Sequence, residues 1–278
     1  MRGNWETEAD RYDSWLASAG QSPGTRKLRA YYLERFARDH SDPWGVTVDE
    51  IAAWLGSPDW SPETRKSARS TLRGFYKWAV LTGRVGASPA EMLPPVRIPR
   101  GLPRPAPEDA VQRAVVGASD RDSLMVLLGA YAGLRAAEIA RLRLDDVDED
   151  LIRVTGKGGR VRDVPTHARI WSAVEAEREQ RRFGRLGDGH RYGEASSPYL
   201  FPGMAAGEHI TPGAVGKILK RVIGCKGHRL RHRFATRAYA GTRDLRAVQE
   251  LLGHTRPETT ARYTLVPDAA LRAAVDAA

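Results

Sequence analysis

Residues 227–236 read Gly-His-Arg-Leu-Arg-His-Arg-Phe-Ala-Thr and lie within segment 217–237, which has eight Lys or Arg and no Asp or Glu. His228 and Arg231 are three residues apart, so on a helix they occupy one face, one turn apart. A helix surface this basic is unfavourable beside a hydrophobic partner and favourable beside phosphate. The segment therefore predicts a helix that presents basic side chains to an anion.

Two further helices are expected after this one. Residues 251–254, Leu-Leu-Gly-His, are typical of a helix that ends at a glycine C-cap, with His254 just past the end. Pro257 favours the start of a new helix, and Tyr263 falls two turns into it. Tyr263 has two interpretations: a core side chain, or a nucleophile aimed at a phosphate that Arg231 holds.

A pair of opposite charges lies upstream. Gly133 ends a strongly apolar helix over 124–132, and a new helix begins at Arg135, three residues before Glu138. The carboxylate is placed to hold the guanidinium. Taken alone, this spacing favours an ordinary surface pair.

A β-hairpin is predicted between these two regions. Residues 151–154 and 160–164 flank a glycine-rich turn that carries Lys157 near its tip. A lysine at such a place is usually solvated, so its interest depends on the residues around it.

These positions together resemble the tyrosine recombinase (phage integrase) family. The family's pattern is a Gly-Leu-Arg with an acid three residues after the Arg, a hairpin Lys, a His-x-x-Arg box, a Leu-Gly-His and a Tyr about nine residues on. The resemblance covers residues 107–267 and rests on order and spacing. It implies the catalytic residues Arg135, Lys157, His228, Arg231, His254 and Tyr263, with Glu138 in support.

The chemistry of these side chains fits cleavage of a DNA phosphodiester. A tyrosine hydroxyl has a pKa of about 10, so Tyr263 needs a proton acceptor, and His228 is placed to be one. Arg135 and Arg231 would bind the non-bridging oxygens. The family implies a 3′-phosphotyrosyl intermediate with a free 5′-hydroxyl, whose leaving oxygen Lys157 would protonate.

The remaining groups are expected to assist or to stay apart from the reaction. His254 would hydrogen-bond the phosphate and Glu138 would orient rather than react. Because the covalent intermediate stores the bond energy, no cofactor, ATP or metal is expected. The acidic cluster over 145–150 is interpreted as a solvated loop.

The family also implies the fold: a mainly α, two-domain chain with an N-terminal four-helix (SAM-like) core-binding bundle. The C-terminal catalytic domain is mixed α/β with a small β-hairpin sheet. We expect domain 1–88, a proline-rich linker over 89–107, which holds seven of seventeen prolines, and domain 108–278. The helix expected at the C-terminal end would dock on a neighbouring protomer, which favours a tetramer on DNA.

The N-terminal part holds six of the seven Trp, interpreted mainly as helical core, and a repeated Ser-Pro-x-Thr-Arg-Lys at 22–27 and 61–66. Each copy starts a helix with Ser as N-cap and Pro at the first turn, which places basic residues near phosphate. The alternative is a solvated basic face. The predicted DNA contacts are Arg26, Lys27, Arg65, Lys66, Arg69, Arg73, Lys217, Lys220, Arg229 and Arg233.

Composition agrees with a DNA-binding protein in a reducing cytoplasm. Of the net charge of +10 over 278 residues, residues 1–99 carry +2 and residues 100–278 carry +8. Such a balance favours nucleic acid, and the lack of a basic amphipathic helix with exposed Trp or Phe argues against a membrane. One cysteine, Cys225, excludes an internal disulfide and is expected to be a small buried side chain.

The biological role has more than one interpretation. The chain begins at the core-binding helices, as in short integrases and Xer-type resolvases without an arm-binding domain. The Ala/Arg-rich composition and the tail 266–272 favour an integrase of a phage or mobile element. The alternatives are an Xer-type dimer resolvase, a type IB topoisomerase-like or resolving enzyme, and a DNA-binding protein that has lost catalysis.

Overall fold

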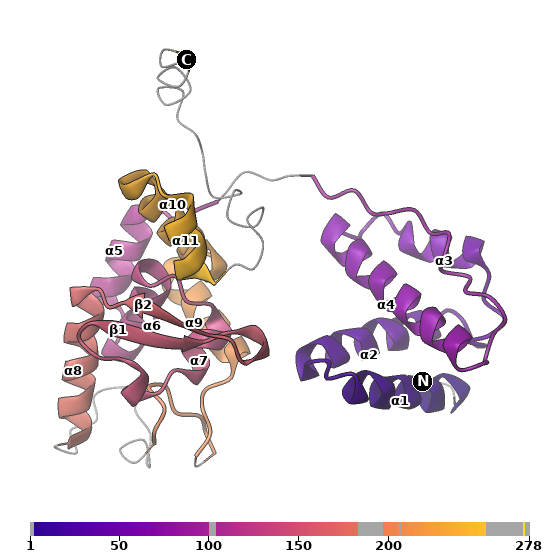
Figure 1. Ribbon diagram of the computed structural model, residues 1–278, viewed down its shortest axis with the longest axis horizontal. Coiled ribbons are helices and arrows are strands. Elements are labelled where there is room, and N and C mark those ends of the chain that lie inside the picture. The colour runs from indigo at the N-terminus through magenta and orange to yellow at the C-terminus, as the bar shows by residue number, and fades with distance from the viewer. Residues whose placement is uncertain (1–2, 100–103, 183–196, 206, 254–274, 276–278) are drawn as a thin grey trace. The chain divides into compact units, whose positions relative to one another are not determined.

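The computed structural model of the protein describes residues 3–99, 104–182, 197–205, 207–253 and 275. The chain forms two compact units, residues 1–100 and 101–278 (Figure 1). The division falls inside the predicted linker.

The first unit is a bundle of four helices, as predicted, and their bounds are α1 (Gly3–Ser18), α2 (Pro23–Ala37), α3 (Val48–Leu55) and α4 (Pro62–Leu81). Helices α2 and α4 begin in the same way. The hydroxyls of Ser22 and Ser61 accept the backbone N–H three residues on, at 3.3 and 3.1 Å, and a proline occupies the first turn. The repeated motif is therefore a repeated helix start.

Aromatic side chains make up much of the core of this unit. Trp5 is fully buried and stacks on Phe75 at 5.4 Å between ring centroids. Trp15 lies at the edge of the core and is 40% exposed. Ala90 and Leu93 are buried in the same core, so the start of the proline-rich segment belongs to this unit and the predicted boundary at 88 is too early.

The second unit is built around one buried helix, α6. The elements of this unit are α5 (Glu108–Gly117), α6 (Asp120–Tyr131), α7 (Ala136–Arg141), β1 (Leu151–Thr155), β2 (Val161–Pro165), α8 (Ala168–Arg182), α9 (Pro212–Ile223), α10 (His228–Thr242) and α11 (Leu245–Leu252). Short 3₁₀ turns lie at 144–146 and 157–159. Helix α6 buries apolar side chains all round, which is typical of a central helix. It packs against α5, α8, α9 and α10.

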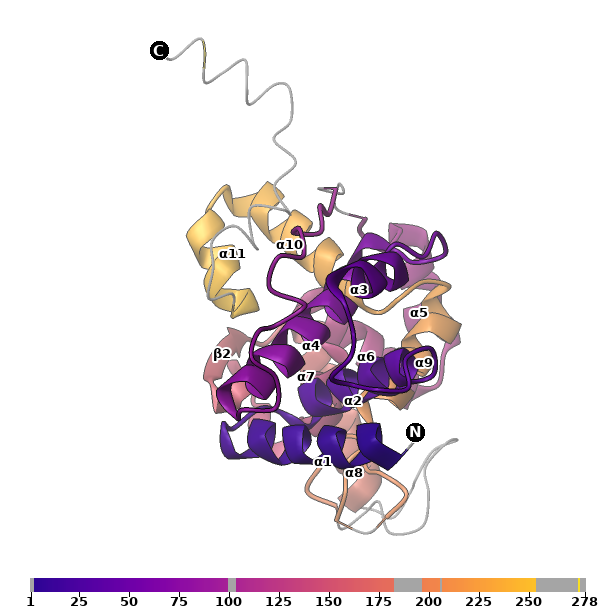
Figure 2. The same ribbon diagram turned by 90° about the vertical axis from the view of Figure 1, so that its right-hand side faces the viewer.

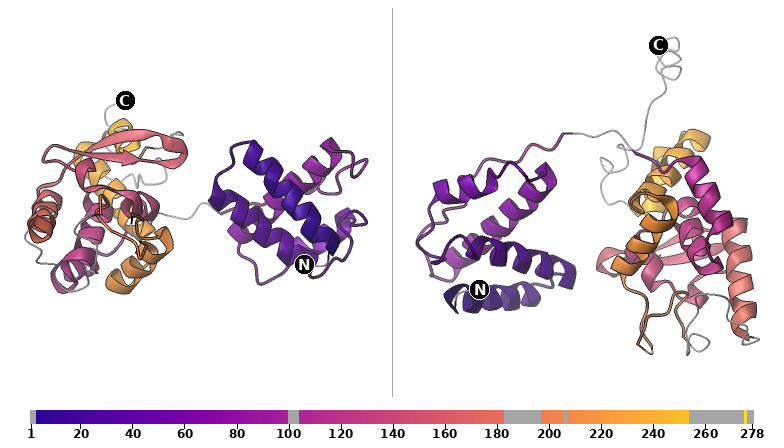
Figure 3. Two further views of the ribbon diagram at one scale, coloured as in Figure 1. Left: turned by 90° about the horizontal axis from the view of Figure 1, so that it is seen from below. Right: turned by 180° about the vertical axis from the view of Figure 1, so that it is seen from behind.

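In the described part of this unit, strands β1 and β2 form a two-stranded antiparallel sheet. Val154 of β1 lies opposite Arg162 of β2. The hairpin lies on the outside of the unit (Figure 3, left). Strand β2 contacts α11, which follows α10 (Figure 2). The mainly helical fold with a small hairpin is confirmed.

Candidate active site

The site is centred on Glu138, in the first turn of α7. Arg135 is the N-cap of this helix, and its backbone N–H donates to Glu138 Oε2 at 2.8 Å. The Arg135 guanidinium donates through Nη1 to Oε1, also at 2.8 Å. The side chain of Glu138 is 4% exposed and that of Arg135 is 40% exposed. The predicted pair therefore has a buried acid and an accessible cation.

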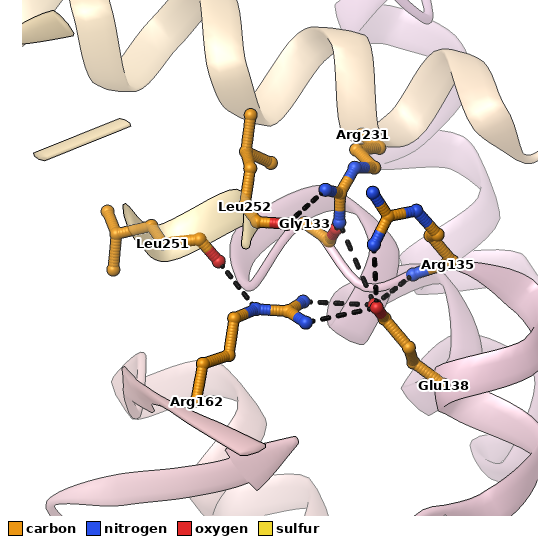
Figure 4. Close-up of polar contacts among 7 residues, drawn as sticks. All are labelled: Gly133, Arg135, Glu138, Arg162, Arg231, Leu251 and Leu252. Carbon is orange, nitrogen blue, oxygen red and sulfur yellow. Dashed lines mark hydrogen bonds and ion pairs between the residues drawn. The ribbon is translucent and has the colours of Figure 1, made fainter. Parts of the chain in front are cut away.

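A second arginine binds the same carboxylate. Arg162, on β2, donates from Nη1 to Oε1 at 3.0 Å and from Nη2 to Oε2 at 2.9 Å. Its Nε donates to the carbonyl of Leu251 in α11 at 2.8 Å. Arg162 thus joins the hairpin, α7 and the end of α11 (Figure 4).

The third arginine of the site is Arg231, whose side chain is 1% exposed. It donates from Nη1 to the carbonyl of Gly133 at 2.6 Å and from Nη2 to the carbonyl of Leu252. Nη1 also lies 3.7 Å from Glu138 Oε2. Arg135 and Arg231, almost a hundred residues apart in sequence, therefore meet at one glutamate.

Two glycines with positive φ allow this close packing. At Gly133 (φ +66°) a Cβ would lie 2.5 Å from the ring of Phe234. At Gly253 (φ +62°), which ends α11 as predicted, a Cβ would lie 3.0 Å from Cδ of Arg162. Glycine is needed at both positions for conformation and for space.

The electrostatics of the site favour an anionic ligand. Burial by itself raises the pKa of Glu138, but the hydrogen bonds from Arg162 and from the backbone of Arg135, with the charges of Arg162 and Arg231, lower it to about 2. The carboxylate is therefore ionised at neutral pH. Three arginines and one glutamate leave a net charge of +2 on the cluster.

Two histidines lie beside this cluster at the start of α10. Partial desolvation, and then the charges of Arg231 and Arg135, lower the pKa of His228, which keeps an exposed edge. The ring of His232 is 4.5 Å from that of His228, and desolvation with the neighbouring positive charge lowers its pKa to about 4. Both imidazoles are thus held in the neutral form, which can accept a proton.

The basic segment does not present all its arginines to solvent, and the prediction for Arg233 is wrong. Arg233 is buried: it donates to both oxygens of Glu108 at 2.8 Å and to the carbonyl of Ala130 at 2.9 Å. The sequence could not reveal this pairing, because Glu108 lies 125 residues earlier. Arg233 therefore ties α10 to α5 and α6.

Four other predicted DNA contacts also have internal partners. Arg26 pairs with Asp13 and Arg65 donates to the carbonyls of Leu55 and Ser57. Arg69 donates to the carbonyl of Leu93, and Arg229 donates to those of Arg104 and Pro105 at 3.1 and 2.9 Å. The other five predicted contacts are exposed, and they are Lys27, Lys66, Arg73, Lys217 and Lys220.

The side chains of three predicted catalytic residues lie outside the part of the chain that the structure describes. His254 and Tyr263 lie outside the described residues, as does the helix expected near the C-terminal end. The backbone at Lys157 forms the turn between β1 and β2, where Gly158 and Gly159 have positive φ. The acidic loop 145–150 is on the surface except for Val147, and in the described ranges no three His, Cys, Asp or Glu side chains gather to hold a metal.

Arg162 is the site residue that sequence reasoning missed. One signal was available. Strand β1 buries alternate residues, and Arg162 lies opposite one of them, Val154, so its side chain is on the inward side of the hairpin. An arginine at such a position needs a partner, although the sequence does not say which. Cys225, predicted to be buried, is partly exposed.

Several known proteins are similar to this chain in sequence. A model of the phage integrase family matches residues 108–269. Tyrosine recombinase XerA of Pyrococcus horikoshii is 30% identical over 280 residues, which cover 97% of this chain and 92% of the relative. Tyrosine recombinase XerC of Azotobacter vinelandii is 37% identical over 210 residues, covering 70% of this chain and 67% of the relative.

A solved structure shares the fold. A lambda integrase dimer bound to a COC′ core site matches with a TM-score of 0.69 and 19% identity, covering 93% of this chain and 94% of that one. The fold and the matched segment define a DNA strand-transferring enzyme. The chain belongs to the phage integrase family and is a tyrosine recombinase.

Proposed function

We propose that the protein cuts and rejoins double-stranded DNA through a 3′-phosphotyrosyl intermediate. The observation that carries this proposal is the cluster of Arg135, Arg231 and Arg162 around Glu138, with a net charge of +2. The transition state of attack on a phosphodiester carries more negative charge than the ground state, and fixed guanidinium groups stabilise that charge.

Arg135 and Arg231 would hold the non-bridging oxygens of the scissile phosphate. His228, kept neutral by its surroundings, would accept the proton of the attacking Tyr263 hydroxyl and return it on rejoining. His254 would donate a hydrogen bond to the phosphate. Lys157, on the hairpin turn, would protonate the 5′-oxygen as the P–O bond breaks, so the charges balance without a metal or ATP.

DNA is the proposed partner, and the protein would act as an oligomer on it. Structures of the same fold include a lambda integrase dimer bound to a core site and a lambda integrase tetramer bound to a Holliday junction. The exposed Lys27, Lys66, Arg73, Lys217 and Lys220 would contact the backbone phosphates. None of the helices in the described ranges has the length and apolarity to cross a bilayer.

For the biological role we propose integration of a phage or mobile element, on the basis of the composition and the tail sequence. Xer-type resolution of dimers is the second candidate, and the alignment with XerA over 97% of this chain favours it. Recombination assays separate the two: an integrase recombines a site on the element with a different site on the host DNA, whereas a resolvase recombines two copies of one chromosomal site.

The proposed mechanism is tested with nicked suicide DNA substrates that carry candidate core sites. Wild-type protein should form a covalent adduct at the 3′ phosphate in the presence of EDTA, and Tyr263→Phe should form none. An adduct that survives Tyr263→Phe would identify another nucleophile. Tight binding without any adduct would favour a DNA-binding protein that has lost catalysis.

A further inference from the structure

Arg162 differs from Arg135, whose side chain is 40% exposed, because all its side-chain nitrogens donate within the protein. Its side chain is 12% exposed. Two nitrogens bind Glu138 and the third binds the carbonyl of Leu251. Arg162 therefore binds the acid of the site and the end of α11, and its effect on cleavage would be indirect.

The first consequence concerns Glu138. Each carboxylate oxygen accepts one hydrogen bond from Arg135 and one from Arg162, all between 2.8 and 3.0 Å. Without Arg162, a buried carboxylate would lose half of these bonds. Since opposite charges attract strongly away from water, the acid would hold Arg135 more tightly and would draw in Arg231, which is 3.7 Å away.

The second consequence concerns the end of α11. Successive carbonyls of its last turn are held by two arginines: Leu251 by Arg162 and Leu252 by Arg231 (Figure 4). Cations at a helix C-terminus stabilise it. Gly253 leaves room for the Arg162 side chain, and the next residue in the sequence is His254.

We propose that Arg162 is a positioning residue for DNA cleavage. It satisfies Glu138, so that Arg135 and Arg231 stay available to the scissile phosphate, and it fixes the end of α11 from which the chain runs to His254. This inference rests on the proposed function.

The experiment compares Arg162→Gln and Arg162→Lys with wild-type protein in single-turnover adduct formation at saturating protein. Arg153→Gln is the matched control, because Arg153 lies on the paired strand, its side chain is 68% exposed and its Nε lies 3.9 Å from Oδ1 of Asp163. We expect Arg162→Gln to slow cleavage by about 10- to 100-fold. Lysine should restore little, because it lacks the planar fork, and Arg153→Gln should match wild type.

A second substrate separates positioning from damage to the fold. It carries a methylphosphonate at the scissile position, which removes the charge of one non-bridging oxygen and so reduces the need for correctly placed guanidinium groups. If Arg162 acts through Arg135 and Arg231, the rate loss in Arg162→Gln should shrink on this substrate. Reactions are run under conditions in which each variant keeps the helical circular dichroism of the wild-type protein. If Arg162→Gln does not fold, the same comparison is made with Arg162→Lys.

The outcomes are distinct. Equal losses on both substrates, or wild-type rates for Arg162→Gln and Arg162→Lys, would overturn the positioning role while leaving the proposed function intact. Failure of the wild-type protein to form any adduct on its recombination site would overturn the proposed function and this inference with it.

Discussion

Glu138 is the residue on which the candidate site depends, because three guanidinium groups converge on its buried carboxylate. Its pKa is lowered from 4.5 to about 2 in the folded protein. A lowered pKa means that ionised Glu138 stabilises the fold above pH 4.5, by about 3 kcal/mol. That contribution is lost as the pH falls from 4.5 towards 2.

Glu138→Gln should therefore destabilise the second unit by about 3 kcal/mol at pH 7, and the difference from wild type should shrink as the pH falls towards 2. Hydrogen exchange of the α7 amides, corrected for intrinsic rates, measures this unit separately from the first. Glu149→Gln, an exposed change in the acidic loop, is the control. A difference that stayed constant down to pH 2 would contradict the ionised, paired state of Glu138.

Among the elements, α11 is the one whose end determines the geometry of the site. Gly253 ends it in a left-handed conformation against Arg162, whereas Gly224 ends α9 in the same conformation with open space around it. Gly253→Ala and Gly224→Ala should each cost about 1 kcal/mol in backbone energy. Thermal melting compares these costs.

The two variants should differ in DNA cleavage. A methyl group at residue 253 would lie 3.0 Å from Cδ of Arg162 and would displace that side chain from its bonds to Glu138 and Leu251, so Gly253→Ala should lose at least tenfold in adduct formation, an effect of about 1.4 kcal/mol on the barrier. Gly224→Ala should keep the wild-type rate. Equal rates for the two would mean that the end of α11 does not control the chemistry.

The elements also show what a single sequence can predict. Local signals predicted the helix starts at Ser22 and Ser61, the end of α11 at Gly253 and the pairing of Arg135 with Glu138, because each depends on residues within one turn. Partners from distant segments were not predictable. Arg162 and Arg233 are directed inward by acids on other elements, and only the tertiary structure brings those acids near.

Over the whole molecule, the charge is uneven, with +2 in residues 1–99 and +8 in residues 100–278. In the repeated motif of the first unit, two adjacent cations differ in their surroundings. In each copy the arginine, Arg26 or Arg65, binds within the unit, while the following lysine, Lys27 or Lys66, is exposed. The exposed lysines are therefore the members of the motif that we expect to contact DNA.

The double variant Lys27→Gln/Lys66→Gln should therefore bind DNA more weakly, and the slope of log K against log salt should become shallower by about 1.8, close to 0.9 for each lost phosphate contact. The control at the adjacent positions, Arg26→Gln/Arg65→Gln, should leave the slope unchanged and lower the melting temperature of the first unit, because it removes internal bonds. Fluorescence anisotropy over a salt series measures both. If the arginine pair changed the slope and the lysine pair did not, the first unit would contact DNA through the opposite members of its motif.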